Sequence, residues 1–168
     1  MITIQSKIHV DRIGGKEIFN FLMNPTDHEY QTWWPGTHLA LHTLKRTPNN
    51  VGTIIYMDEF IGDRRVKASC IVIEAEPAKK VVWQVKKLIR LPIWFSLELE
   101  DDTEGVAITH TIRAGFEGVK GMYDVLFRLY FSDKFAAAMD EHVKIEFPKL
   151  RDMLSSAKVH MPEHLAKS

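Results

Sequence analysis

The chain has 168 residues, and its 22 Lys and Arg balance 22 Asp and Glu, so the formal net charge is zero. Hydrophobic residues make up 45% and charged residues 26%, values typical of a globular domain. A balanced charge argues against a dedicated nucleic-acid-binding protein, which needs a basic surface to replace the counterions of phosphates. No run of 18 apolar residues is present, so we expect no transmembrane segment.

The cysteine content and the start of the chain indicate a compartment. Cys70 is the single cysteine, so it cannot form a disulfide within the chain. The first residues also lack the basic and apolar regions of a secretory signal. Both features are typical of the reducing cytoplasm, which is the predicted location.

Residues 2–10 alternate apolar and polar side chains, which predicts a half-buried strand. Residues 16–23 then carry apolar side chains at helical spacing, and Pro25 prevents that helix from continuing. Thr26-Asp27-His28-Glu29 has the spacing of a capping box, which predicts a second short helix that ends near Trp33-Trp34.

The middle of the chain, from residue 38 to residue 118, has the pattern of strands and short turns. Its connections are too short for crossover helices, so we expect antiparallel hairpins. One turn is expected at Leu91-Pro92 and another at Gly62-Asp63. The predicted strands are 38–46, 53–60, 66–75, 80–88, 93–100 and 106–115.

From about residue 119 to residue 156 the apolar period changes to 3.6, which predicts one long helix. An antiparallel sheet with one apolar face needs a cover, and this helix supplies it. The predicted fold class is therefore α+β, with a seven-stranded antiparallel sheet curved around a long C-terminal helix. Because one helix is only about 10 Å wide, such a sheet tends to leave a pocket beneath it. A single domain is predicted over 1–157, followed by a frayed tail over 158–168.

This order of elements resembles the helix-grip fold of the START-like (SRPBCC) superfamily, and several segments look like its polyketide cyclase/dehydrase-like branch. The resemblance implies a cavity for an apolar ligand between sheet and helix, and catalysis in only some members. It implies no common catalytic signature. The segments that carry it are Phe21-Leu22-Met23-Asn24-Pro25, Tyr30, Trp33-Trp34-Pro35-Gly36, Val51-Gly52-Thr53, Glu76-Pro77 with Val82-Trp83, and Phe147-Pro148-Lys149-Leu150.

Strict alternation along a strand predicts which side chains face the pocket. For strand 38–46 the sequence leaves both faces open. Elsewhere the predicted inward residues are Ile54, Tyr56, Asp58, Phe60, Ile71, Ile73, Ala75, Val81, Trp83, Val85, Phe95, Leu97, Leu99, Ile108, His110 and Ile112.

Three polar residues of that set are candidate catalytic residues. His110 could serve as a general acid or base, and Asp58 with Tyr56 could form an acid/base pair. The alternative is a core histidine and two residues that face water. The predicted ligand-binding residues are Trp34, Tyr56, Trp83, Phe95, Leu97, His110, Phe135 and Met139.

Two pairs of histidines have the residue type of metal ligands. His38 and His42 would share a strand face, and His160 and His164 are four residues apart. Neither pair has a third ligand at a suitable spacing, so the sequence predicts no metal site and no cofactor.

The leading functional hypothesis is the binding or transport of a small hydrophobic molecule in the cavity. An enzyme of the cyclase/dehydrase type, with His110 acting together with Asp58 or Tyr56, is the second hypothesis. The third is a protein-interaction module with a filled core and an exposed apolar patch. The sequence decides neither the ligand, nor whether a reaction is catalysed, nor the oligomeric state.

Overall fold

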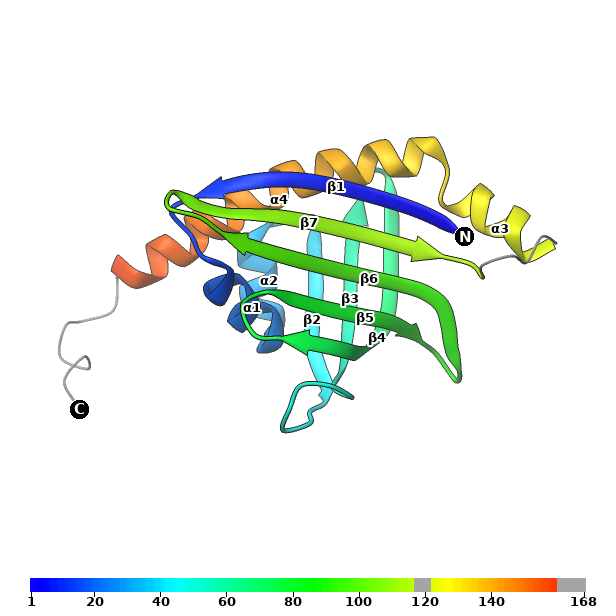
Figure 1. The fold of residues 1–168 in the computed structure, drawn as a ribbon, viewed down its shortest axis with the longest axis horizontal. Helices are drawn as coiled ribbons and strands as arrows, with labels where there is room; N and C mark the ends of the chain where they lie inside the picture. The colour runs from blue at the N-terminus through cyan, green and yellow to red at the C-terminus, as the bar shows by residue number, and fades with distance from the viewer. Residues whose placement is uncertain (117–121, 160–168) are drawn as a thin grey trace.

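The computed structural model describes residues 1–116 and 122–159, which form a curved sheet with helices packed along it (Figure 1). The strands are β1 Ile2–Asp11, β2 His38–Lys45, β3 Ile54–Ile61, β4 Arg64–Glu76, β5 Lys80–Lys86, β6 Arg90–Asp101 and β7 Gly105–Ala114. The helices are α1 Gly15–Met23, α2 Asp27–Trp33, α3 Met122–Tyr130 and α4 Asp133–Val159.

Within the described residues the strands form one seven-stranded sheet in the order β1-β7-β6-β5-β4-β3-β2, and all neighbouring strands are antiparallel. The predicted α+β helix-grip architecture is confirmed. The turn expected at Leu91-Pro92 is wrong, because both residues lie inside β6 and the chain reverses at 87–89 instead.

The two short helices begin and end as predicted. The backbone N–H of Glu29 donates to the Thr26 hydroxyl at 3.2 Å, and that hydroxyl donates to the Glu29 carboxylate at 2.5 Å. These bonds satisfy a free N–H at the start of α2. The helix ends at Trp33, so two adjacent indoles stand where the chain enters β2.

The predicted C-terminal helix over 119–156 is two helices. Helix α3 ends at Tyr130 and α4 begins at Asp133, while residues 117–121 lie outside the described part of the chain. The Ser132 hydroxyl accepts a hydrogen bond from the backbone N–H of Phe135 at 3.4 Å, which caps the start of α4. Val125 and Leu129 of α3 are exposed, although the 3.6 period of one continuous helix places them on the buried stripe.

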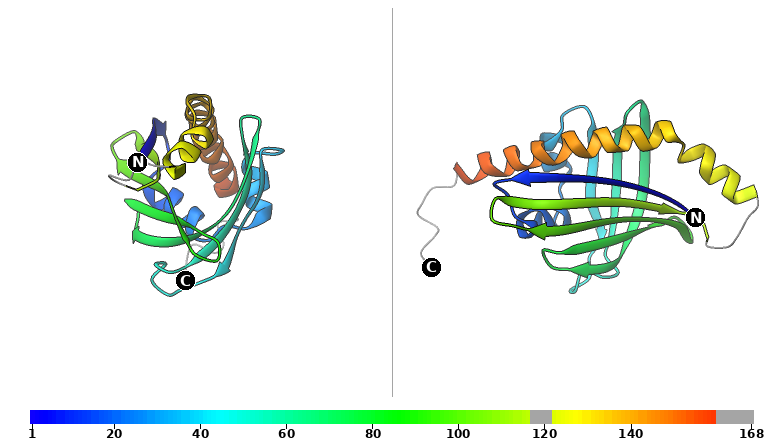
Figure 2. Two further views of the ribbon diagram at one scale, coloured as in Figure 1. Left: turned by 90° about the vertical axis from the view of Figure 1, so that its right-hand side faces the viewer. Right: turned by 45° about the horizontal axis from the view of Figure 1, so that its top comes forward.

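The sheet curves around α4, with β1, β7 and β6 on one side of the helix and β4, β3 and β2 on the other (Figure 2). Helix α4 packs against β1, β3 and α2. Its buried face includes Met139, Val143, Phe147 and Leu150. The apolar core therefore lies between the concave face of the sheet and α4.

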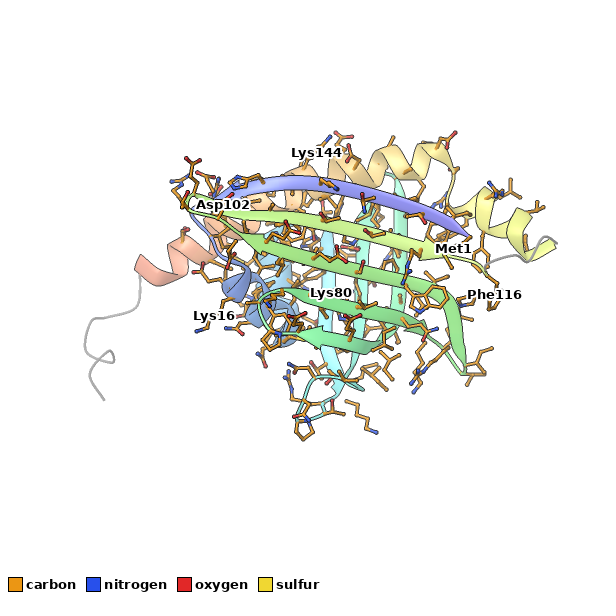
Figure 3. All side chains as sticks on the ribbon, viewed as in Figure 1. Met1, Lys16, Lys80, Asp102, Phe116 and Lys144 are labelled. Atoms are coloured by element: carbon orange, nitrogen blue, oxygen red, sulfur yellow. The ribbon has the colours of Figure 1, made fainter. Side chains whose placement is uncertain are left out.

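Most charged side chains lie on the outer surfaces. Lys80 is on the convex side of the sheet and Lys144 points away from it on α4 (Figure 3). Lys80 pairs with Glu74 at 3.1 Å, and Lys144 pairs with Asp140 at 2.6 Å. Among the described residues, no helix is long and apolar enough to cross a membrane.

Candidate functional site

A cavity of about 530 Å³ lies between the concave face of the sheet and helices α2, α3 and α4. Its walls are mainly aliphatic and aromatic. Volumes of about 300–1,000 Å³ with apolar walls and few polar groups are typical of sites for small molecules. This cavity is the candidate functional site.

Six of the predicted ligand-binding residues line this cavity. Strands β5, β6 and β7 contribute four of them, and α4 contributes two. They are Trp83, Phe95, Leu97, His110, Phe135 and Met139. Their contact with a ligand stays a prediction, but their inward orientation is confirmed.

Tyr56 and Asp58 do not line the cavity, because the predicted register was one residue off in β3 and in most of β4. The β4–β5 hairpin begins as expected, with Ala75 opposite Val81. A β-bulge between Val72 and Glu74 then shifts the register, so that Val72 lies opposite Trp83.

Because of this bulge, the opposite set of side chains faces the cavity in β3 and in the part of β4 that precedes Glu74. Cys70 and Ala68 of β4 face the cavity, and so do Ile55, Met57, Glu59 and Ile61 of β3. Ile71, Ile73, Ile54, Tyr56, Asp58 and Phe60 belong to the opposite alternation and are absent from the cavity wall. Burial raises the pKa of the Cys70 thiol to about 12, which agrees with its predicted role as a small hydrophobic residue.

On the other face, Asp58 forms an ion pair. The Arg65 guanidinium donates two hydrogen bonds of 2.8 Å to its carboxylate, and Lys67 lies 3.4 Å away. The bonds from Arg65 hold the pKa of Asp58 below its usual value. Tyr56 lies beside His42, with ring centroids 5.3 Å apart. The predicted acid/base partners of His110 are therefore on the opposite side of the sheet.

The two adjacent tryptophans have different positions. Trp33 is buried and lines the cavity, and its indole N–H donates to the backbone carbonyl of Glu146 at 2.6 Å. Trp34, the residue predicted to bind the ligand, is absent from the cavity wall. Its ring lies 4.8 Å from that of His142, and the Lys149 ammonium lies 5.6 Å from it.

One end of the cavity is open. The solvent-exposed residues of its wall include Lys87 at the tip of the β5–β6 hairpin, and Leu126 and Tyr130 on α3. Two further apolar side chains of these elements, Leu88 and Leu129, are 100% and 69% exposed. The hairpin and α3 extend from the same end of the sheet, as Figure 1 and the right-hand view of Figure 2 show.

The other end of the cavity is closed by buried polar residues, which we name the His/Glu cluster: His38, Glu59, His142 and Glu146. Glu59 and Glu146 line the cavity. One ligand atom from each of the four residues lies within 4.8 Å of the others. Strands β2 and β3 supply one half of the cluster, and α4 supplies the other half from adjacent turns.

The imidazoles of the cluster face the carboxylates without hydrogen-bonding to them. His38 Nε2 lies 3.7 Å from Glu59 and 3.6 Å from Glu146. His142 Nε2 lies 3.7 Å from each of the same carboxylates. Neither Nε2 atom has a hydrogen-bond partner among the described residues.

Burial favours the neutral form of each of these four groups. It raises the pKa of Glu59 to about 7 and that of Glu146 well above its usual value. It also lowers the pKa of His38 to about 3 and that of His142 to about 4. The Tyr30 hydroxyl donates to Glu59 Oε2 at 2.5 Å, and burial followed by the Glu59 charge raises the pKa of that hydroxyl.

The sequence did not predict the cluster, because register shifts in β4 and β2 change which side chains face the cavity. The bulge in β4 puts Glu59 inside in place of Asp58, and a register shift in β2 separates His38 from His42. His42 instead pairs with Asp27 at 2.8 Å and is partly exposed. The spacing His142-x-x-x-Glu146 places two potential ligands on one helix face and was the available signal. His160 and His164 lie outside the described residues.

His110 and Trp83 contribute the other notable polar atoms of the wall. His110 Nδ1 and Trp83 Nε1 are buried and have no hydrogen-bond partner among the described residues. Burial, with a smaller contribution from His142, lowers the pKa of His110 to about 4. His110 is therefore neutral at pH 7, with a nitrogen that a ligand can satisfy.

Comparisons with known proteins agree on the fold. No family model matches the sequence, and no curated protein matches it. The structure is similar to TTHA0849 from Thermus thermophilus, with a TM-score of 0.63 and 10% identity over 93% of this chain and 99% of that one. It is also similar to major latex-like protein 151 from Panax ginseng, with a TM-score of 0.55 and 14% identity over 84% and 96% of the two chains.

A third similar structure is the Aha1 dimer from Colwellia psychrerythraea, with a TM-score of 0.50 and 19% identity over 89% of this chain and 99% of that one. At these identities the likeness concerns the fold alone. The chain therefore has the helix-grip fold of START-like proteins, as the sequence resemblance implied.

Proposed function

We propose that this protein binds a small, mainly apolar molecule in the cavity between the sheet and helices α3 and α4. The observation that carries this proposal is an apolar cavity of about 530 Å³ that is open at the α3 end. Closely packed cores have few voids larger than a water molecule, so a space of this size in a small domain needs a reason.

The polar atoms of the wall indicate what such a ligand carries. Trp83 Nε1 is a donor and His110 Nδ1 a donor or acceptor, and neither has a partner among the described residues. A buried polar atom without a partner costs free energy, which a ligand with one or two polar groups recovers. We therefore expect an apolar molecule with a carbonyl, hydroxyl or similar group near one end.

Native mass spectrometry of protein purified from its own host tests this proposal directly. We expect an organic molecule that co-purifies with the folded chain and leaves it on denaturation. Binding of the uncharged fluorescent probe N-phenyl-1-naphthylamine gives a second readout.

Two variants on adjacent residues of β4 locate the binding. Ala68 faces the cavity, whereas Ser69 faces the other side of the sheet. Ala68→Phe should abolish probe binding because the ring fills the cavity, and Ser69→Phe should keep it. Equal binding by the two folded variants would contradict the proposal.

Catalysis of the cyclase/dehydrase type is the second candidate, because His110 lines the cavity and is neutral at pH 7. A neutral imidazole can accept a proton from a bound ketone or enol. Asp58 and Tyr56 cannot assist it from the far face of the sheet. A His110→Gln variant that binds the ligand but no longer converts it would favour this candidate over simple binding. The interaction-module hypothesis required a filled core, and the cavity does not favour it.

A further inference from the structure

We propose that the His/Glu cluster binds one divalent first-row transition-metal ion at the closed end of the cavity. This inference goes beyond ligand binding and does not depend on it. It rests on the geometry of the four side chains, on their charge and on the aromatic rings that hold them.

The cluster surrounds a common centre. Its four imidazole–carboxylate distances are 3.6–3.7 Å, and its ligand atoms all lie within 4.8 Å of one another. A tetrahedral ion with bonds of about 2.0–2.1 Å separates its ligands by about 3.3–3.4 Å. Small side-chain movements therefore bring the cluster to coordination distance.

The charge of the cluster matches such an ion. Glu59 is buried and the side chain of Glu146 is only 12% exposed, and among the described residues their ion-pair contacts reach imidazoles and no Lys or Arg. Once both carboxyl groups release their protons, two carboxylates with two neutral imidazoles balance a charge of +2. The bound ion then supplies the opposite charge that buried carboxylates need.

Three buried nitrogen atoms of the cluster lack hydrogen-bond partners among the described residues, namely His38 Nδ1 and the two Nε2 atoms that a metal would use. His38 is 1% exposed and His142 is 4% exposed, and the Nε2 atom of each has no hydrogen-bond partner among the described residues. Buried polar atoms are nearly always satisfied, so two such atoms aimed at the same pair of carboxylates require an explanation. A hydrogen-bond network does not provide it, because distances of 3.6–3.7 Å are too long.

Neighbouring aromatic groups orient the ligands. The Tyr30 ring stacks on His38 at 4.0 Å with a 4° angle, and its hydroxyl donates to Glu59. Trp33 lies edge-on to His38 at 4.6 Å, and Trp34 covers His142. Outer contacts of this kind fix the ring orientation and hold a ligand set together before the ion arrives.

The donor types define the class of ion. Two imidazole nitrogens and two carboxylate oxygens suit Zn²⁺, Fe²⁺, Mn²⁺ or Co²⁺, whereas Mg²⁺ and Ca²⁺ prefer oxygen ligands alone. Glu59 and Glu146 line the cavity, so an ion can reach the cluster through it. A ligand in the cavity would then also be close to the ion.

The test is a titration of the chelator-treated protein with Zn²⁺ against a chromophoric competitor, together with native mass spectrometry for stoichiometry. We expect one ion per chain. His142→Gln and Glu146→Gln should each weaken Zn²⁺ binding by more than about 100-fold, since loss of even an outer partner costs about 10–100-fold. The matched control is His42→Gln, which removes a partly exposed imidazole of β2 outside the cluster and should bind Zn²⁺ unchanged.

A second measurement keeps the test decisive if a variant fails to fold. Co²⁺ bound by the unmodified chain should show the visible absorption of a low-coordinate nitrogen and oxygen site. Failure of the chain to bind one equivalent of Zn²⁺, Co²⁺, Mn²⁺ or Fe²⁺ would overturn the proposal. Equal Zn²⁺ affinity in folded His142→Gln and in the unmodified chain would do the same. Neither outcome affects probe binding in the Ala68→Phe and Ser69→Phe pair, so the two proposals fail separately.

Discussion

The two ends of the cavity differ in burial and polarity. At the open end, apolar side chains of α3 and of the β5–β6 hairpin are exposed, including Leu88 and Leu129. At the closed end, α2 packs over four buried ionisable side chains. A folded chain normally places apolar groups inside and ionisable groups outside. Here the open end exposes apolar side chains, and the closed end buries ionisable ones. Such departures are expected where a protein binds something, because binding covers the apolar surface or neutralises the charge.

The closed end should be more sensitive to truncation than the open end. Trp33 is 3% exposed, packs edge-on against Phe21 and donates to the Glu146 carbonyl. Trp33→Ala should lower the free energy of unfolding by about 3–5 kcal/mol. Urea denaturation monitored by circular dichroism measures this loss, and a loss below about 1 kcal/mol would show that the closed end is loosely packed.

Removing one hydroxyl from the closed end tests its polar network. Tyr30→Phe keeps the ring stacked on His38 but removes the donor to buried Glu59. We expect a loss of about 1–3 kcal/mol, because the carboxyl is left without this partner. Tyr130→Phe on exposed α3 is the matched control and should change stability by less than about 0.5 kcal/mol. Equal losses in the two variants would contradict the contrast between the ends.

His110 lies in the cavity wall, and its lowered pKa should make the free energy of unfolding depend on pH. Burial lowers its pKa in the folded chain to about 4 from an ordinary 6.5, so the unfolded chain binds the proton first. Its contribution to stability is complete above about pH 6.5 and is lost as the pH falls toward 4. The expected loss between pH 8 and pH 5 is on the order of 2 kcal/mol.

Denaturation of His110→Gln at the same pH values measures this contribution, because the variant should lose less stability on acidification. His9→Gln, at a partly exposed histidine of β1, is the matched control. If both variants show the same pH dependence, His110 is not buried in the neutral form.

The smallest effect is expected at the open end. Leu129→Ser replaces a side chain that is 69% exposed, so it should change the free energy of unfolding by less than about 0.5 kcal/mol. A loss above about 1.5 kcal/mol in denaturant would show that α3 packs more tightly than its exposure indicates.

The sequence predicted the architecture but only part of the site. Periodicity and turn residues indicated the seven strands, the two short helices and the C-terminal helix that covers the sheet, because these elements follow from local patterns of apolar residues. The side of each strand depends on register, and a single bulge near Ile73 reversed the faces of β3 and most of β4. The predicted polar residue was Asp58, whereas the neighbouring Glu59 is the one that faces the cavity.

The His/Glu cluster could not be assembled from sequence spacing. His38 and His142 are far apart along the chain, and the fold alone brings their rings to a centroid distance of 5.8 Å. Long-range packing therefore decides the cluster. The break between α3 and α4 was missed for a different reason, because Ser132 caps a new helix inside an apolar period that continues through it.

The central claim is that the closed end of the cavity binds a metal ion while the open end admits an apolar ligand. X-ray diffraction from crystals of the Zn²⁺-loaded protein, collected at the zinc absorption edge, tests the first half most directly. The account predicts one strong anomalous peak about 2.0–2.2 Å from the Nε2 atoms of His38 and His142 and from a carboxylate oxygen of Glu59 and Glu146. An anomalous map with no peak among these four side chains, or with zinc only on surface histidines, would contradict it.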